Sequence, residues 1–292
     1  MRVFLTGATG YIGAVVAEYL PMAGHHLIAL ARSQSEADTL RAAGISPFEG
    51  DLSGAAGLRI PADAGAVIHT AMDWGPDAAR IDEAAVRAIL AALSGTGKPF
   101  VYTSGVWVLG DTKGRVAGEM APLRPPAIVA WRPAVERLVL DSVSEGIRAS
   151  ILRPAMVYGR TGGFVGAMVK DARDSGVVQV TGDGENHWSF VHVEALADLY
   201  VRAVEQQPRG EMFLAADGPA FKVRSVAEAI AGTHSARVEF QPVEEVRSQR
   251  GPLADALIMD QRIMSTKAGR MLGWAPKAPT VLEEIRSGSY PA

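Results

Sequence analysis

Short apolar runs alternate with amphipathic segments through the first half of the chain. The apolar runs predict strands near residues 2–6, 26–31, 45–49, 66–70, 99–104 and 149–153. Helix-spaced apolar positions predict helices near residues 11–22, 34–43, 77–94 and 131–145. This alternation favours an α/β fold, in which a parallel sheet is doubly wound by right-handed crossovers. Sheets of this kind bind ligands outside the carboxyl ends of their strands.

The pattern becomes looser after residue 154. It predicts a helix near 164–174, strands near 177–181 and 211–215, and helices near 193–206, 223–231 and 280–287. Prolines and glycines interrupt residues 111–130, so we expect an irregular loop over the active site there. We therefore predict a first domain over residues 1–155. Residues 156–292 mainly form a small C-terminal α/β substrate lobe, with some segments returning to the core of the first domain.

A glycine-rich turn, G-A-T-G-Y-I-G, joins the first predicted strand to the first predicted helix. Gly7 permits a sharp turn, Gly10 leaves the backbone open to a pyrophosphate, and Gly13 lets the helix lie close to the strand. The start of that helix adds N–H groups and a positive dipole end. Glycine-rich turns are also common as purely structural features. The place of this one, after the first strand, favours a Rossmann dinucleotide-binding sheet.

Composition narrows the classes of protein and partner. The 292 residues are 48% hydrophobic and 21% charged, with a net charge of −3. These values are typical of a globular chain, and they leave no basic stripe for nucleic acid. The chain has no cysteine, and its few histidines are scattered, so we expect no metal site. With neither a signal-peptide pattern nor a membrane-length apolar run, we expect a cytoplasmic protein with a small-molecule substrate. Whether it forms a homodimer is left open.

Several ordered segments resemble the extended and atypical short-chain dehydrogenase/reductases, the NAD-dependent epimerase/dehydratase-like proteins. They are residues 6–13, 51–52, 67–71, 100–105, 152–159, 190–193 with Asp198, 265–268 and 272–276. The resemblance spans nearly the whole chain and implies a Rossmann fold with a nicotinamide cofactor. It implies cofactor contacts at Gly7, Thr9, Gly10, Tyr11, Ile12, Arg32, Ser33, Asp51, Leu52, Thr70, Ala71, Met72, Arg132, Pro154, Ala155, Met156 and Val157.

The end of the second predicted strand indicates which nicotinamide cofactor is used. NAD enzymes of this fold usually place an acidic residue there to hold the ribose 2′-hydroxyl. This chain has Ala31, followed by Arg32 and Ser33. A guanidinium can hold a 2′-phosphate through charge-assisted hydrogen bonds, each contributing roughly 1.5–3 kcal/mol. The alternative is that Arg32 is simply a solvated residue at a strand end. The missing acid favours NADP(H), bound by the domain over 1–155.

The resemblance implies a catalytic Tyr and Lys four residues apart, with a Ser or Thr after the fifth strand. Here the Tyr position falls on Ile128, the Lys position on Arg132 and the hydroxyl position on Gly105. An Asn that many members carry on the preceding helix corresponds to Asp82. Ile128 cannot transfer a proton, whereas Arg132 can hold a ribose hydroxyl and supply positive charge. Either another group supplies the proton, or no hydride step occurs.

Five side chains are catalytic candidates in this degenerate site. Arg132 is the expected cofactor clamp, and Ser104, one residue before the vacated hydroxyl position, can orient a carbonyl. Tyr158, Asp73 and His187 are candidate proton donors. Each of these three has a structural alternative: core packing for Tyr158, a helix cap or loop for Asp73 and a loop surface for His187.

These observations predict an NADP-dependent oxidoreductase or epimerase. Its substrate would be the carbonyl or secondary alcohol of a small apolar molecule, with hydride passing between nicotinamide C4 and the substrate carbon. The alternative is a non-redox protein on the same scaffold. It would be an isomerase or lyase that uses the pocket alone, or a regulatory protein that senses NADP(H).

Overall fold

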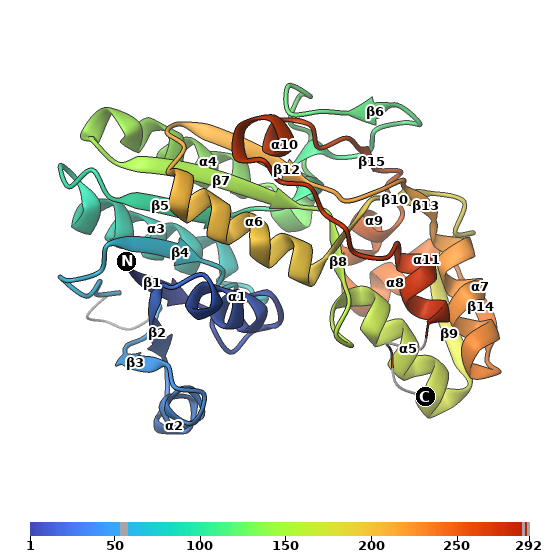
Figure 1. Cartoon of the computed structure of the whole chain (residues 1–292). Helices are drawn as coiled ribbons and strands as arrows, with labels where there is room; N and C mark the ends of the chain where they lie inside the picture. The colour runs from blue at the N-terminus through green and yellow to red at the C-terminus, as the bar shows by residue number, and fades with distance from the viewer. Residues whose placement is uncertain (53–57, 288–289, 291–292) are drawn as a thin grey trace. The chain divides into compact units, whose positions relative to one another are not determined.

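The computed structural model describes residues 1–52, 58–287 and 290. The chain divides into two compact units (Figure 1). Unit 1 contains residues 1–104, 131–152 and 197–213, and unit 2 contains residues 105–130, 153–196 and 214–292. The domain boundary that the sequence predicts at residue 155 would keep residues 105–130 in the first domain, whereas the structure groups them with unit 2. Residues 197–213 group with unit 1, although they follow that boundary.

Unit 1 is built on a seven-stranded sheet with the order β12-β7-β5-β4-β1-β2-β3. The strands are β1 (Arg2–Thr6), β2 (His26–Ala31), β3 (Ser46–Glu49), β4 (Ala66–His69), β5 (Pro99–Thr103), β7 (Arg148–Pro154) and β12 (Glu211–Ala215). The pairs β1–β2, β1–β4, β2–β3, β4–β5 and β5–β7 are all parallel. The strand order reverses between β1 and β4. A sheet of this topology binds its ligand at that point.

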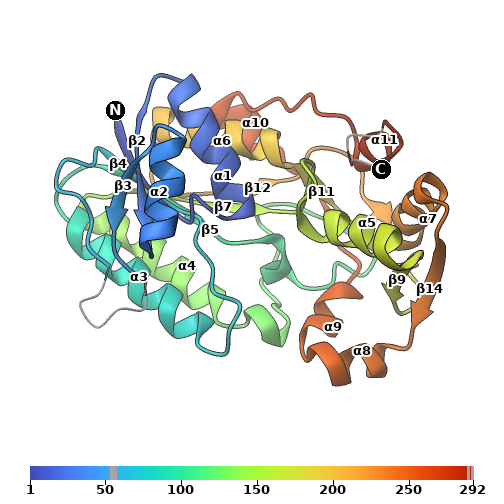
Figure 2. The same cartoon turned by 90° about the horizontal axis from the view of Figure 1, so that it is seen from below.

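Helices cover both faces of this sheet. The helices α1 (Tyr11–Met22) and α6 (Val193–Gln206) lie on one face, and α3 (Ala78–Leu93) and α4 (Arg132–Asp141) lie on the other (Figures 1 and 2). The helix α2 (Gln34–Ala42) connects β2 to β3. Fully buried Phe4, Val67 and Tyr102 of the sheet share one core with Val86 and Ile89 of α3. This core fixes the strands whose carboxyl ends carry the candidate site.

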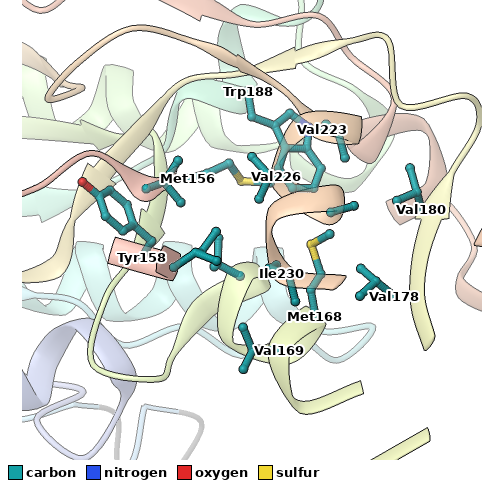
Figure 3. Close-up of a cluster of buried hydrophobic side chains, with 14 of the residues drawn as sticks. Met156, Tyr158, Met168, Val169, Val178, Val180, Trp188, Val223, Val226 and Ile230 are labelled. Atoms are coloured by element: carbon teal, nitrogen blue, oxygen red, sulfur yellow. The ribbon is translucent and has the colours of Figure 1, made fainter. Parts of the chain in front are cut away.

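Unit 2 has its own apolar core. Trp188, Val226, Ile230 and Met168 point toward one another between the elements of this unit, and Tyr158 lies at the edge of the cluster (Figure 3). The larger elements are α5 (Gly163–Ser175), β9 (Val177–Thr181), α7 (Val223–His234), β14 (Arg237–Gln241) and α8 (Val243–Arg250). The shorter ones are η1 (Val106–Leu109), β6 (Val116–Ala117), η2 (Ala127–Val129), β8 (Met156–Tyr158), β10 (His187–Trp188), β11 (Phe190–His192), β13 (Phe221–Lys222), α9 (Leu253–Leu257), β15 (Arg262–Ile263), α10 (Lys267–Leu272) and α11 (Val281–Arg286).

The α/β class and the doubly wound parallel sheet predicted from the sequence are confirmed. The strands predicted in the first half match the observed ones to within about a residue at each end. The predicted helix over 131–145 is α4 followed by the 3₁₀ turn η3 (Ser142–Glu145). Within the described ranges, every helix is too short or too polar to pass through a lipid bilayer.

Candidate cofactor and catalytic site

The glycine turn brings the start of α1 against the chain that leaves β4. Gly7 has a φ of 80°, and a Cβ atom there would lie 2.7 Å from the backbone nitrogen of Ala71. A Cβ on Gly13 would lie 2.0 Å from the Gly7 carbonyl oxygen, so only glycine fits. Gly10 is the N-cap of α1, and its N–H donates to the Gly7 carbonyl at 2.9 Å. The turn is therefore as compact as a pyrophosphate-binding turn must be.

The predicted contacts beside this turn lie at the same edge of unit 1. Thr9 lies in the turn itself, and Tyr11 and Ile12 form the first residues of α1. Thr70 follows β4, and its hydroxyl donates to the Thr6 carbonyl at 2.7 Å. The N-terminal N–H groups of α1 lie beside the point where the strand order reverses between β1 and β4. They can donate hydrogen bonds to a phosphate group bound there.

Arg32 lies at the carboxyl end of β2, but the structure gives it a partner that the sequence analysis missed. Its guanidinium is 64% exposed and forms an ion pair with Glu36, with Nη2 and Oε1 2.8 Å apart. The Arg32 backbone N–H also donates to Glu36 Oε2 at 2.8 Å. Hydrogen bonding to Glu36 and its negative charge raise the pKa of Arg32, and the charges of Asp51 and Asp73 add to this effect. Ser33 caps α2, because its hydroxyl accepts from the Glu36 N–H.

Three further predicted residues follow β3 and β4 at this edge. Asp51 is exposed, whereas Leu52 is half-buried and packs against the core of unit 1. Asp73 is exposed in the loop after β4, where its carboxylate accepts from the Gly75 N–H at 2.5 Å. The carboxylate of Asp73 thus stabilises a turn of its own loop.

A buried chain of hydrogen bonds crosses the carboxyl edge of the sheet. Thr6 Oγ1 lies 2.7 Å from His69 Nδ1, and His69 Nε2 lies 3.3 Å from Asp82 Oδ1. The Tyr102 hydroxyl donates to Asp82 Oδ2 at 2.7 Å. Arg132 Nη1 in turn donates to the Tyr102 oxygen at 3.2 Å. All five side chains are buried, so the chain holds Arg132 in a fixed place.

Arg132 has three further contacts that orient its guanidinium. Nη1 donates to the Thr103 carbonyl at 2.9 Å, and Nη2 lies 3.0 Å from the sulfur of Met72. The guanidinium carbon lies 4.7 Å from the ring centre of Trp131, within cation–π range. A thioether is a weak acceptor, so a stronger oxygen acceptor can readily displace Met72 from Nη2. Arg132 and Met72, both predicted as cofactor contacts, are thus brought together.

The buried chain cannot supply the missing proton donor. Burial raises the pKa of Tyr102 well above its ordinary value, so its hydroxyl stays protonated. Burial opposes the ionisation of Asp82, but hydrogen bonding to His69 and the charges of His69 and Arg132 hold its pKa below the usual range. The network is therefore an ionised carboxylate and a neutral phenol that position a cation.

Ser104 carries an unused hydroxyl at the end of β5. Its backbone N–H donates to the Leu152 carbonyl at 2.8 Å, but its buried Oγ has no hydrogen-bond partner among the described residues. Buried polar atoms in native proteins are almost always paired, so an unpaired one points to a group that binds there. At the neighbouring Gly105, an added Cβ would meet its nearest neighbour at 3.9 Å, which leaves room for a side chain.

The remaining candidates belong to unit 2. The Tyr158 ring is buried against His192, and its hydroxyl donates to the Pro279 carbonyl at 2.5 Å. That hydroxyl points away from the apolar cluster (Figure 3), and burial raises the pKa of Tyr158 far above its ordinary value. His187 Nδ1 lies 3.0 Å from Asp260 Oδ2, and Nε2 has no hydrogen-bond partner among the described residues. Of these two candidate donors, only His187 keeps a polar side-chain atom without a hydrogen-bond partner among the described residues.

The segment 154–157 joins β7 to β8 within unit 2. The Ala155 N–H donates to the Ala215 carbonyl at 2.9 Å, and the Met156 N–H donates to the Ser189 carbonyl at 3.0 Å. Val157 pairs in register with Val191 of β11. The backbone of this predicted nicotinamide-side segment is therefore fixed by its neighbours. No group of three or more potential metal ligands occurs among the residues that the structure describes.

Comparisons with known proteins place this geometry in context. The sequence model of the NAD dependent epimerase/dehydratase family matches residues 3–216. The chain is 33% identical to an uncharacterized protein of Schizosaccharomyces pombe, over 99% of this chain and all of the relative. It is 26% identical to a 4-hydroxy-2-methyl-3-oxo-4-farnesyl-3,4-dihydroquinoline-1-oxide ketoreductase of Stigmatella aurantiaca, over 82% of this chain and 75% of the relative.

A solved structure extends the comparison to the fold. A dTDP-glucose 4,6-dehydratase of Streptomyces venezuelae with NAD bound superimposes with a TM-score of 0.82. The match covers 100% of this chain and 98% of the dehydratase, at 17% identity. At that identity the likeness concerns the fold.

Proposed function

The chain belongs to the NAD dependent epimerase/dehydratase family of nicotinamide-dependent enzymes, and we propose that it is an NADP(H)-dependent oxidoreductase or epimerase. The proposed substrate is the carbonyl or secondary alcohol of a small apolar molecule. The observation that carries the proposal is the compact glycine turn of unit 1, beside a strand end with Arg32 and without an acid. When bound, the cofactor supplies or accepts the hydride.

The NADP preference rests on the side chains after β2. Ala31 leaves no carboxylate at the strand end to hold a ribose 2′-hydroxyl or repel a 2′-phosphate. The exposed Arg32 guanidinium can receive the phosphate, together with the N terminus of α2 at Ser33. Glu36 opposes this, because it occupies one edge of the guanidinium. A 2′-phosphate therefore has to share Arg32 with Glu36, which makes Glu36 part of the cofactor preference.

The catalytic proposal assigns Arg132 and Ser104 to positioning and polarisation. Arg132, held by Tyr102 and Thr103, can bind the nicotinamide ribose and place a fixed positive charge beside the reacting oxygen. The unpaired hydroxyl of Ser104 can donate to a substrate carbonyl. Asp73, Tyr158 and His187 stay candidate proton donors. His187 is favoured over Tyr158, because its Nε2 has no hydrogen-bond partner within the described ranges, whereas the Tyr158 hydroxyl donates to the Pro279 carbonyl.

A cavity within unit 2 supports a small apolar substrate. Its volume is about 60 Å³, and Phe164, Met168, Trp188 and Leu257 contribute its apolar wall. The polar side of the cavity is formed by Asp171, Gln179, Thr181, Gln241 and Arg250. Pockets for larger ligands occupy roughly 300–1,000 Å³, so this one suits a short apolar group better than a nucleoside diphosphate. The printed name of the ketoreductase relative also indicates an apolar ketone, but that farnesylated molecule is far larger than this cavity, so the name supports the apolar carbonyl and not the small size.

A non-redox function on the same scaffold is the second candidate. It is favoured by the apolar Ile128 at the position of the proton donor and by the bonded hydroxyl of Tyr158. Such a protein would bind NADP(H) as an isomerase, a lyase or a regulatory sensor. It would bind the cofactor without changing its oxidation state.

Loss of NADPH absorbance in the presence of candidate substrates tests the proposal. We expect oxidation of NADPH with small apolar ketones. With NADP⁺ in place of NADPH, we expect no conversion of dTDP-glucose or UDP-glucose, measured by product analysis. A higher kcat/KM for a sugar nucleotide would contradict the proposed substrate class. Failure to bind NADPH at all would contradict the proposed cofactor.

A further inference from the structure

A second cavity of unit 2 includes one candidate proton donor, His187, and its other lining residues have no role in the function proposed above. Its volume is about 450 Å³, within the range of small-molecule sites. Val116, Ala216, Pro219 and Ile263 contribute apolar walls. It shares no lining residue with the smaller cavity at Trp188. The two cavities of unit 2 are therefore separate.

An ion cluster forms the polar side of this cavity. Arg262 Nε donates to Asp260 Oδ1 at 3.1 Å, and Arg262 Nη2 lies 3.2 Å from His187 Nδ1. Both His187 and Arg262 line the cavity. Although partial burial opposes ionisation of Asp260, hydrogen bonds and charge from Arg262 and His187 hold its pKa below the usual range. Asp260 is thus a stable anion that orients the other two side chains.

Two nitrogen atoms of the cluster have no hydrogen-bond partner in the part of the chain that the structure describes. Arg262 uses Nε and Nη2, and among the described residues Nη1 has no hydrogen-bond partner. His187 uses Nδ1, and no described residue bonds to its Nε2. A guanidinium carries five N–H donors and an imidazole has a second ring nitrogen, so both groups keep unused capacity. An apolar cavity with two unused polar atoms at one wall is typical of a ligand site.

The cluster is held rigidly by the backbone around it. The Asp260 carbonyl accepts from both the N–H and the hydroxyl of Thr112, at 2.7 and 2.9 Å. The Arg262 N–H donates back to the Thr112 hydroxyl at 3.2 Å. The Gln261 N–H donates to the His187 carbonyl at 2.7 Å. Because the donors are already in place, a ligand loses little affinity to ordering them.

We infer that this cavity binds a small monocarboxylate with an apolar tail. One carboxylate oxygen would accept from Arg262 Nη1 and the other from a protonated Nε2 of His187. Asp260 already neutralises one positive charge of the cluster, which disfavours a dianion such as a phosphate monoester. The apolar walls, with Val116 and Met264 more than half exposed at the rim, suit an alkyl or aryl tail. The assignment gives His187 a ligand-binding role, and Asp73 and Tyr158 are then the remaining candidate proton donors.

Calorimetric titration with 3-phenylpropionate and its neutral isostere 3-phenylpropanamide tests the inference. The carboxylate should bind saturably, and the amide should bind roughly 10- to 100-fold more weakly, because it lacks the charge. Arg262→Gln should weaken carboxylate binding by a similar factor. Arg237→Gln is the matched control, since Arg237 is an exposed arginine of the same unit, paired with Glu239. The control should bind like the wild type.

Gly218→Leu provides a test that leaves the charges intact. Gly218 lines the cavity, and an added Cβ there meets no atom within 4 Å, so the larger side chain can fill the space without a clash. This variant should lose binding of 3-phenylpropionate and keep the melting temperature and NADPH affinity of the wild type. Equal binding of acid and amide, wild-type binding by Gly218→Leu, or no saturable binding would each overturn the inference.

Discussion

The ion pair between Arg32 and Glu36 allows a two-sided test of cofactor preference. The guanidinium is 64% exposed, so the pair itself contributes at most about 1 kcal/mol to stability. A 2′-phosphate on the same guanidinium contributes roughly 1.5–3 kcal/mol. Arg32→Ala should therefore weaken NADPH binding about 10- to 100-fold, leave NADH binding nearly unchanged and hardly affect melting.

Substitution of the other partner of this ion pair, Glu36→Gln, should strengthen NADPH binding. It removes the competing carboxylate, which at about 1 kcal/mol corresponds to roughly a fivefold gain in affinity for NADPH and little change for NADH. Fluorescence titration with both cofactors measures each variant. Arg41→Ala is the matched control, because Arg41 is paired with Asp38 on the same helix. Equal losses of both cofactors in Arg32→Ala, or no loss of either, would refute the assignment of the 2′-phosphate to Arg32.

Three further predictions concern the glycine turn, the cofactor clamp and the effect of pH. Gly10→Ala should lose NADPH affinity in titration and keep the wild-type melting temperature. Gly13→Ala should lose about 1–3 kcal/mol of stability, because its Cβ would lie 2.0 Å from the Gly7 carbonyl oxygen. The opposite pattern would contradict the roles assigned to these two glycines. Arg132→Lys should keep most of the cofactor affinity, and Arg132→Met should lose much of it. If both variants bind NADPH like the wild type, the alignment of α4 with the catalytic helix of the family is wrong. Burial raises the pKa of Asp217 to about 6, above its unfolded value of about 4, so its ionisation lowers stability progressively as pH rises through that interval. Asp217→Asn should therefore stabilise the protein above pH 6, by up to about 2 kcal/mol after allowance for solvent screening, and have little effect near pH 4 in denaturant titrations.

The sequence predicts the sheet of unit 1 well because its central strands are buried on both faces, although the edge strand β3 has only exposed and half-buried residues. Runs such as Val3–Leu5 and Val67–Ile68 are continuous apolar stretches between turn residues, the usual signature of a parallel strand. The strands β8 and β14 in unit 2 are short or half-exposed and lack this signature, so they were not predicted. Their pairing with β11 and β9 depends on tertiary packing that a local pattern does not contain.

Except for Glu36, the same limit explains what was predicted and what was missed in the site. The glycine turn is local, and its geometry agrees with the predicted strand, turn and helix. Glu36 was missed although its signal is also local, since an acid four residues after Arg32 on a helix start predicts an ion pair. The contact of Tyr102 with Asp82 is not local, because it depends on how α3 lies across β5. The Arg262 cluster likewise joins segments that are about 75 residues apart in the chain.

Isotope transfer tests the central claim most directly. The enzyme is incubated with a small apolar ketone that it turns over and with NADPH deuterated at C4, in separate runs for each of the two C4 faces. A reductase should move deuterium from one face into the alcohol product. An epimerase with transient oxidation is tested in a separate run with NADP⁺ and an alcohol substrate deuterated at its carbinol carbon. It should move that deuterium transiently onto the cofactor. Turnover without isotope movement in either direction, undiminished with a redox-inert cofactor analogue, would contradict the oxidoreductase account and leave the non-redox function in its place.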